Sequence, residues 1–198
     1  AIEKDMPTIA LVHGDAYTPS GSDYAPIDKE RMKAYADIDA WLIGHIHRPD
    51  IISAQHPLIL YAGSPHALSP KEQGMHGPFV LTVDGRNFTY EQVAFSPVRY
   101  EHLMIDVSGQ EDRSAVRNHI VTQINEYSGS VADTNRMSLL VYDLTLYGSY
   151  GNPDELLTLK EELADFEGSH SFTISIRKIN IDTKPIVDMN NTVMRFSK

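Results

Sequence analysis

The sequence contains no cysteine, which excludes disulfide bonds and thiolate metal sites. A metal ion would need imidazole, carboxylate, amide or water ligands, and such mixed sites suit manganese, iron, magnesium or zinc. Basic residues are also scarce, because 17 lysines and arginines stand against 27 acidic residues, a formal net charge of -10. Any affinity for nucleic acid would therefore have to come from metal ions, a few arginines or a partner protein.

Long apolar runs are missing as well. No stretch approaches the ~20 residues needed to cross a bilayer, and residues 1–5 lack the basic and apolar regions of a signal peptide. We therefore expect a cytoplasmic protein without a membrane partner. The hydrophobic fraction of 41% is ordinary for a soluble chain, and 198 residues suffice for one large domain or two small ones.

The first half of the sequence alternates short apolar runs with loop or helical segments, which is typical of an α/β sheet. The strands predicted from these runs cover residues 9–12, 41–44, 50–54 and 58–62, with a helix over 27–36. A hairpin is predicted from 79–83 and 88–93, joined through Asp84-Gly85, because Asp-Gly tolerates the positive φ of tight turns.

The pattern changes near Ser96-Pro97. The segments predicted beyond that point are strands over 100–107, 137–147 and 171–179 and amphipathic helices over 110–127 and 153–166. This β-α-β-α-β order indicates a small α+β domain over 97–180 that follows a first domain over 1–96. Residues 181–198 are expected to form a tail that either packs on its own domain or offers a partner surface through Ile186, Val187, Val193, Met194 and Phe196.

Three histidines follow predicted strands. His13 ends the first one, and His45 and His47 lie in the sequence Gly-His-Ile-His over 44–47, directly after a buried strand. Residues i and i+2 of an extended chain share a face, and the carboxyl ends of parallel strands are where α/β sheets carry their chemistry. Because neutral imidazole is a common metal ligand, we interpret the three as metal ligands. A single histidine at a strand end is more often a hydrogen-bonded or solvated residue.

Further residues are expected near the substrate, and these are Arg48, Ser64, His66 and His76. Arg48 would contact a phosphate or, equally well, pair with Asp39 or Asp50. Ser64 belongs to a Gly-Ser turn that lets the chain pass close to the metals. For the two histidines a structural or solvated role is favoured, because neither lies within a ligand motif.

These motifs resemble those of a known family. The order Leu-Val-His-Gly-Asp (11–15), Gly-His-Ile-His-Arg-Pro (44–49) and Tyr-Ala-Gly-Ser-Pro-His (61–66), followed by Glu72 and His76-Gly77, resembles the second half of calcineurin-like metallophosphoesterases. Within that family it looks most like the SbcD/YhaO type of DNA repair exonuclease. The resemblance implies half of a metallophosphoesterase β-sandwich flanked by helices, followed by a capping domain that helps to select DNA.

The same resemblance implies a site and partners. His13 and His45 would bind one divalent metal and His47 a second, with manganese the expected ion and iron, magnesium or zinc the alternatives. Two such ions together clamp a phosphodiester and generate hydroxide near neutral pH. The expected partners are DNA and an SbcC-like ATPase in double-strand break repair, and a homodimer is a further option.

The resemblance is incomplete. Such enzymes also use Asp-x-His, Gly-Asp-x-x-Asp and Asn-His-Asp/Glu motifs, and this sequence has none of them. Thr18 stands where a second aspartate should follow Asp15, and Asn118-His119 falls in a predicted helix. We therefore expect a C-terminal portion of a longer exonuclease that is inactive alone. The alternatives are another phosphoesterase of the same fold, or a non-catalytic partner-docking or dimerisation module with vestigial histidines.

Overall fold

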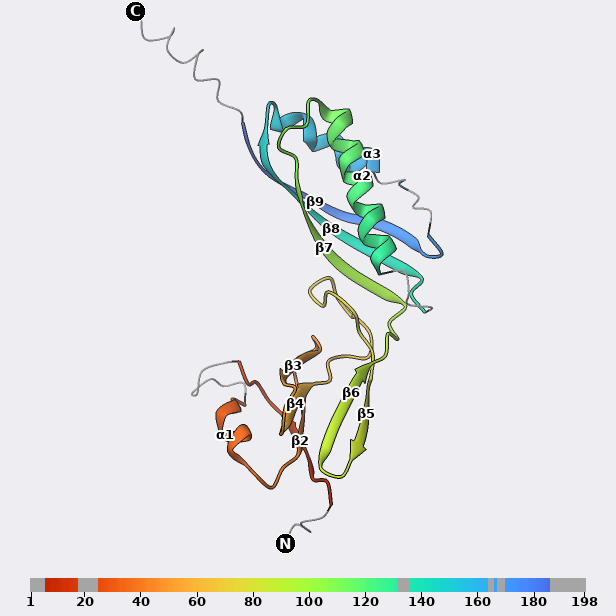
Figure 1. Ribbon diagram of the computed structural model, residues 1–198. Coiled ribbons are helices and arrows are strands. Elements are labelled where there is room, and N and C mark those ends of the chain that lie inside the picture. Colours follow the sequence, from red (N-terminus) through yellow and green to blue (C-terminus); the bar gives the residue numbers. More distant parts are fainter. Residues whose placement is uncertain (1–5, 18–24, 132–135, 164–165, 167–169, 186–198) are drawn as a thin grey trace, which may run out of the picture. The chain divides into compact units, whose positions relative to one another are not determined.

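The computed structural model describes residues 6–17, 25–131, 136–163, 166 and 170–185. It divides into two compact units, Ala1–Arg99 and Tyr100–Lys198. The residues described form three sheets and a few helices, which confirms the expected mixed α/β class (Figure 1). The assignment of separate roles to two domains stays a prediction.

The first unit is built on a four-stranded sheet in the order β1-β2-β4-β3. Its strands are β1 (Ile9–His13), β2 (Ala40–Gly44), β4 (Leu58–Tyr61) and β3 (Asp50–Ser53). β1 and β4 run parallel to β2, whereas β3 is antiparallel to β4. The three parallel strands therefore end at the same edge, where their loops can meet.

Alternate residues of β2 and β4 enter two different cores. Ile43, Ile59 and Tyr61 point to the face covered by helix α1 (Lys29–Ala34), where Met32 is buried. Ala40, Leu58 and Leu60 point to the opposite face. The hairpin of β5 (Phe79–Asp84) and β6 (Asn87–Gln92) covers that face through Phe79, Leu81 and Phe88. Burial on both faces explains why β4 is a continuous apolar run.

A buried carboxylate joins the opposite, amino-terminal edge of this sheet. Asp39 precedes β2, and its side chain accepts hydrogen bonds from Thr8 N (2.8 Å), His56 Nε2 (2.8 Å) and Arg86 Nε (2.7 Å). Thr8 precedes β1, His56 lies in the loop before β4, and Arg86 lies in the turn of the hairpin. One side chain thus ties the beginnings of all three parallel strands to the hairpin.

The second unit is a three-stranded sheet in the order β7-β8-β9, with β8 parallel to β9. Its elements are β7 (Val98–Asp106), α2 (Arg113–Ser130), β8 (Leu139–Tyr150), the 3-10 helix η1 (Pro153–Thr158), α3 (Leu159–Leu163) and β9 (Thr173–Pro185). Val116, Ile120 and Ile124 form the buried stripe of α2 and belong to the same core as residues of the sheet. Figure 1 shows α2 lying over this sheet. Asp112 caps this helix by accepting a hydrogen bond from Ala115 N.

Several element boundaries differ from those predicted. The hairpin loop is Gly85-Arg86 rather than Asp84-Gly85, because Asp84 pairs with Asn87 as the last rung. The helix predicted over 153–166 begins as η1 and becomes α3 only at Leu159. β9 continues to Pro185, so residues 181–185 belong to the sheet and not to a tail.

The remaining tail positions, 186–198, lie outside the described residues. Among the helices that the structure describes, none is both long and apolar enough to cross a bilayer.

Candidate functional site

The fold brings His13 and His45 together at the carboxyl edge of the first sheet. β1 and β2 are parallel and in a register that pairs His13 with Gly44, so His45 follows directly on the neighbouring strand. The two imidazole rings lie edge to face, with centroids 5.3 Å apart and planes at 74°. His45 has a φ of 102°, an uncommon conformation for a residue other than glycine. Both side chains are exposed, so their nitrogens are open to a ligand from solvent.

Two glycines make room for this arrangement. A Cβ added at Gly44 would lie 2.9 Å from Nδ1 of His13, so the His13 ring occupies the space beside the Gly44 backbone. A Cβ at Gly14 would lie 2.4 Å from the carbonyl oxygen of Ala25, which no substitution can relieve without moving the backbone. Close contacts therefore require glycine at position 14, directly after His13, and at position 44, directly before His45.

Tyr61, at the end of β4, fixes the loop that follows His13. Its buried hydroxyl accepts a hydrogen bond from Ala16 N (2.7 Å) and donates one to the carbonyl of Gly14 (2.9 Å). Burial raises the pKa of Tyr61, outweighing the hydrogen bond from Ala16, and the charge of Asp15 acts in the same direction as burial. The phenol therefore stays protonated and continues to donate.

His47 lies two residues after His45 and is held by a carboxylate. Its Nδ1 lies 3.2 Å from Oε1 of Glu72, and its side chain is 58% exposed whereas that of Glu72 is 13% exposed. The other carboxylate oxygen, Oε2, accepts hydrogen bonds from Leu68 N (3.0 Å) and Ser64 Oγ (3.1 Å). Burial raises the pKa of Glu72, but hydrogen bonds from Leu68, His47 and Ser64 outweigh it and hold the pKa below its usual value.

His76 is buried behind this carboxylate and is only 1% exposed. Its Nδ1 lies 3.1 Å from the carbonyl oxygen of Ser64 and 3.2 Å from the Ser64 hydroxyl. Its Nε2 is buried and has no hydrogen-bond partner among the residues described. His66 is exposed on the same loop.

Arg48 and Asp50 continue the chain beyond His47. Asp50 accepts a hydrogen bond from the hydroxyl of Tyr17. Burial and Asp50 raise the pKa of Tyr17, and the charge of Arg48 opposes this rise only in part. Asp39, the other predicted partner of Arg48, is instead engaged by Arg86 and His56. Arg48 is exposed beside the histidines.

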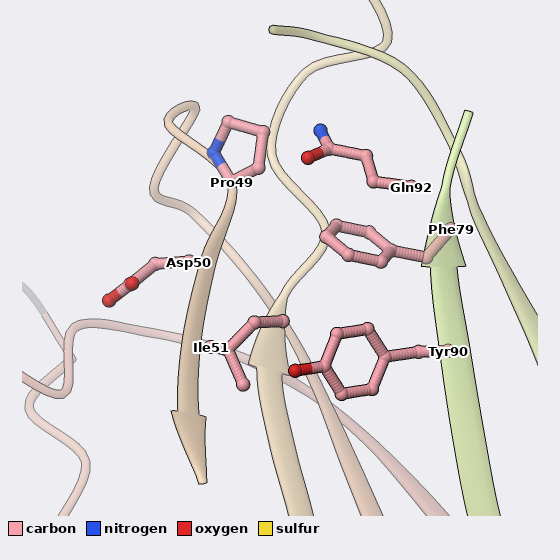
Figure 2. A pocket seen from close by; sticks show the side chains of 6 residues that line it. All are labelled: Pro49, Asp50, Ile51, Phe79, Tyr90 and Gln92. Atoms are coloured by element: carbon pink, nitrogen blue, oxygen red, sulfur yellow. The ribbon is translucent and has the colours of Figure 1, made fainter. Parts of the chain in front are cut away.

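A cavity of about 310 Å³ opens next to this segment, between β3 and the hairpin. Figure 2 shows the rings of Phe79 and Tyr90 facing Pro49 and Ile51, with the side-chain amide of Gln92 above the rings. Gln92 Nε2 donates to the carbonyl of Met75 (3.3 Å). The walls are mainly apolar and aromatic, with Asp50 and Gln92 as polar groups, and the cavity therefore suits a planar group that carries a polar edge.

The residues present match a metal ion in donor type but not in number. His13 and His45 offer imidazole nitrogens side by side, a donor type that zinc and iron accept. Within the described ranges, however, no group of three or more histidine and carboxylate side chains is placed to hold a metal. Two adjacent divalent ions also need bridging anions to offset their repulsion, and His13 and His45 supply none. These residues therefore do not by themselves form the implied two-metal centre.

Glu72 is the residue that sequence reasoning left without a role. It appears in the motif order that carries the family resemblance, but it lies 25 positions after His47, and no local spacing rule connects the two. The signal that could have found it is general, since histidines that bind metals usually donate their other ring N–H to a carboxylate.

Comparison with known proteins gives one informative similarity. No protein-family model matches the sequence. The chain is 29% identical over 109 residues to a protein of Bacillus subtilis (strain 168) described as "Uncharacterized metallophosphoesterase YhaO". The matched part is 54% of this chain but 26% of that protein, so the chain spans about a quarter of the relative's length. This supports a distant relationship to metallophosphoesterases, enzymes that use divalent metals to hydrolyse phosphoesters.

Proposed function

We propose that this chain carries the histidine-bearing part of a two-metal phosphodiesterase site that acts on DNA ends. The observation that carries the proposal is the juxtaposition of His13 and His45 at the carboxyl edge of a parallel sheet. The similarity to a metallophosphoesterase supports hydrolysis of a phosphoester. DNA as substrate, manganese as metal and a role in double-strand break repair with an SbcC-like ATPase are further parts of the proposal.

The chemistry would need ligands from elsewhere. Divalent ions, when bound, supply an activated water and stabilise the charge on phosphate oxygens. His13 and His45 would hold one ion and His47 the other, and the carboxylate ligands would come from residues beyond these 198. The exposed Arg48 would position a phosphate oxygen by a bidentate contact. The second unit would then select the DNA, as the resemblance implies.

A nuclease assay with manganese tests the proposal. The 198-residue chain alone should not cleave linear DNA, because its ligand set is incomplete. The native polypeptide that contains this sequence should cleave linear DNA. In that polypeptide, His45→Asn should lower the rate by more than ~10–100-fold, because that is the usual loss when only a residue that supports a metal ligand is removed. His102→Asn is the matched control, since His102 is exposed in the second unit and bonds Thr145. Equal activity of the His45 variant and the wild type would contradict the proposal.

One observation favours a second function, that of a non-catalytic docking module. The part of the chain that the structure describes contains no group of three or more side chains able to hold a metal. A docking module would bind neither Zn²⁺ nor Mn²⁺, whereas the proposed site should bind Zn²⁺ weakly through His13 and His45. Isothermal titration of the chain with Zn²⁺, with and without the His45→Asn substitution, separates the two functions.

A further inference from the structure

We infer that Glu72, Ser64 and His76 form a buried positioning relay that fixes the ring of His47 with Nδ1 protonated, so that Nε2 presents its lone pair outward. The inference rests on the proposed function in one respect, because a bound metal ion would give the outward lone pair its use. The relay itself follows from hydrogen-bond directions alone. His76 is its buried end and His47 its exposed end.

The direction of each hydrogen bond is determined by groups that can only donate or only accept. The carbonyl oxygen of Ser64 only accepts, so His76 Nδ1, 3.1 Å away, must carry a proton. The same N–H reaches the Ser64 hydroxyl oxygen at 3.2 Å, which leaves the hydroxyl proton free to donate. That proton is directed at Oε2 of Glu72, 3.1 Å away, or shared with the carbonyl of His47 at 3.3 Å.

The carboxylate then decides the state of His47. Its Oε2 already accepts from Leu68 N and Ser64 Oγ, so Oε1 is the atom that faces His47 Nδ1 at 3.2 Å. An ionised carboxylate only accepts, and therefore the neutral His47 ring carries its proton on Nδ1. The unprotonated Nε2 is the nitrogen able to bind a cation, and the side chain is 58% exposed.

Glutamine at position 72 should reverse this state. The Oε2 position receives two donors, Leu68 N–H and Ser64 O–H, so the glutamine oxygen has to occupy it. The glutamine NH₂ then faces Nδ1 of His47, which must accept, and the ring proton moves to Nε2. A change of one atom would thus remove the outward lone pair without changing the size of the side chain.

The test is nitrogen NMR of the ¹⁵N-labelled 198-residue chain without added metal, at about pH 8.5, where an ordinary imidazole with a pKa of ~6.5 is neutral. The His47 signals are assigned with a His47→Asn variant. The His47 ring should be protonated mainly on Nδ1 in the wild type and mainly on Nε2 in Glu72→Gln. In Glu72→Asp, which retains a carboxylate, it should be protonated on Nδ1 as in the wild type. Glu91→Gln, an exposed glutamate of β6, should change nothing.

A wild-type ring protonated on Nε2, or an unchanged ring in Glu72→Gln, would overturn the inference. If Glu72→Gln fails to fold, the wild type and Glu72→Asp still decide, because both must show protonated Nδ1. Titration with Zn²⁺ reports separately on the proposed function, because Zn²⁺ binding through His13 and His45 should be weakened by His45→Asn and left unchanged by Glu72→Gln. A fixed tautomer in a chain that binds no Zn²⁺ would leave the relay established and the metal site refuted.

Discussion

At the scale of single residues, Asp39 is held by three hydrogen-bond donors from separate parts of the first unit. Its side chain is fully buried and accepts hydrogen bonds from Thr8, His56 and Arg86. Burial raises the pKa of Asp39, but these hydrogen bonds and the positive charge of Arg86 outweigh burial and hold the pKa below its ordinary value. A buried carboxylate is tolerated here because both of its oxygens accept hydrogen bonds.

The first prediction concerns this carboxylate. Asp39→Asn should lower the free energy of unfolding by about 1–3 kcal/mol, because the amide replaces an acceptor with a donor that opposes one of the three N–H groups. A depressed pKa stabilises the fold at pH values above the unfolded-state pKa of ~3.9, and this contribution is lost as the pH falls through the folded value. The variant should therefore show a smaller loss of stability below about pH 4.

Urea denaturation at about pH 7 and pH 3 measures both effects. Asp37→Asn is the control, because Asp37 is exposed in the same loop. An Asp39 variant with the stability of the control at neutral pH would show that the cluster does not stabilise the sheet.

The candidate site shows which residue positions a sequence can predict. His13 and His45 were identified from strand-end positions, and their juxtaposition follows from two short parallel strands in register. The contact between His47 and Glu72 joins residues 25 positions apart, with β3 and β4 between them, so no local spacing rule predicts it. The metal-binding role of the three histidines stays a prediction.

At the scale of secondary-structure elements, β1 is the edge strand of the first sheet as described. Leu11 pairs with Leu42 and points to the same face of the sheet as Leu42. The hairpin does not cover Leu11, which is 77% exposed. Ile9 on the same face of the strand is 44% exposed. An edge strand with apolar residues in solvent is a surface that other chains can pair with or pack on.

The second prediction follows from this edge. Leu11→Lys should leave the unfolding free energy within about 0.5 kcal/mol of the wild type, because the side chain is already in water. It should reduce concentration-dependent self-association of the chain, since a lysine on an edge strand opposes pairing. Sedimentation velocity over a range of concentrations measures the association.

Met104→Lys provides the comparison, because Met104 is 63% exposed on β7 in the second unit. Equal association of the two variants and the wild type would show that β1 is not the surface responsible.

Most strands were predictable because apolar runs and turn residues mark them, and the observed bounds of β1 to β6 fall within two residues of those expected. The region around Pro153 was harder. Leu156, Leu159 and Leu163 have helical spacing and are all buried, but the chain enters as a 3-10 helix before becoming α-helical. Apolar spacing reports which residues are buried and does not separate these two helix types.

At the scale of the whole molecule, the two units have separate hydrophobic cores. One core contains only residues of the second unit, including Ile120, Leu140 and Leu144, and the other two contain only residues of the first. Stability is therefore a property of each unit, and a core substitution in one should act mainly there.

The third prediction tests this separation. Ile120→Ala should destabilise the second unit by about 2–5 kcal/mol, because Ile120 is fully buried between α2 and the sheet. Hydrogen exchange followed by mass spectrometry should show faster exchange in residues 100–185 and little change in β2 and β4. Arg117→Ala, a partly exposed position on the same helix, is the control. Equal acceleration in both units would mean that they unfold as one.

The Asp39 cluster has a consequence for how this sheet can diversify. It holds the amino-terminal ends of the three parallel strands, whereas His13, His45 and His47 lie at or after the carboxyl ends of β1 and β2. The residues of this cluster and the histidines proposed for chemistry therefore do not overlap. Lineages could exchange these histidines while abundance in the cell stays constant, whereas Gly14, Gly44 and Tyr61 at the same edge hold the backbone in place. A saturation library scored for abundance and for activity would separate accordingly, with the first map centred on Asp39, His56 and Arg86 and the second on His13, His45 and His47.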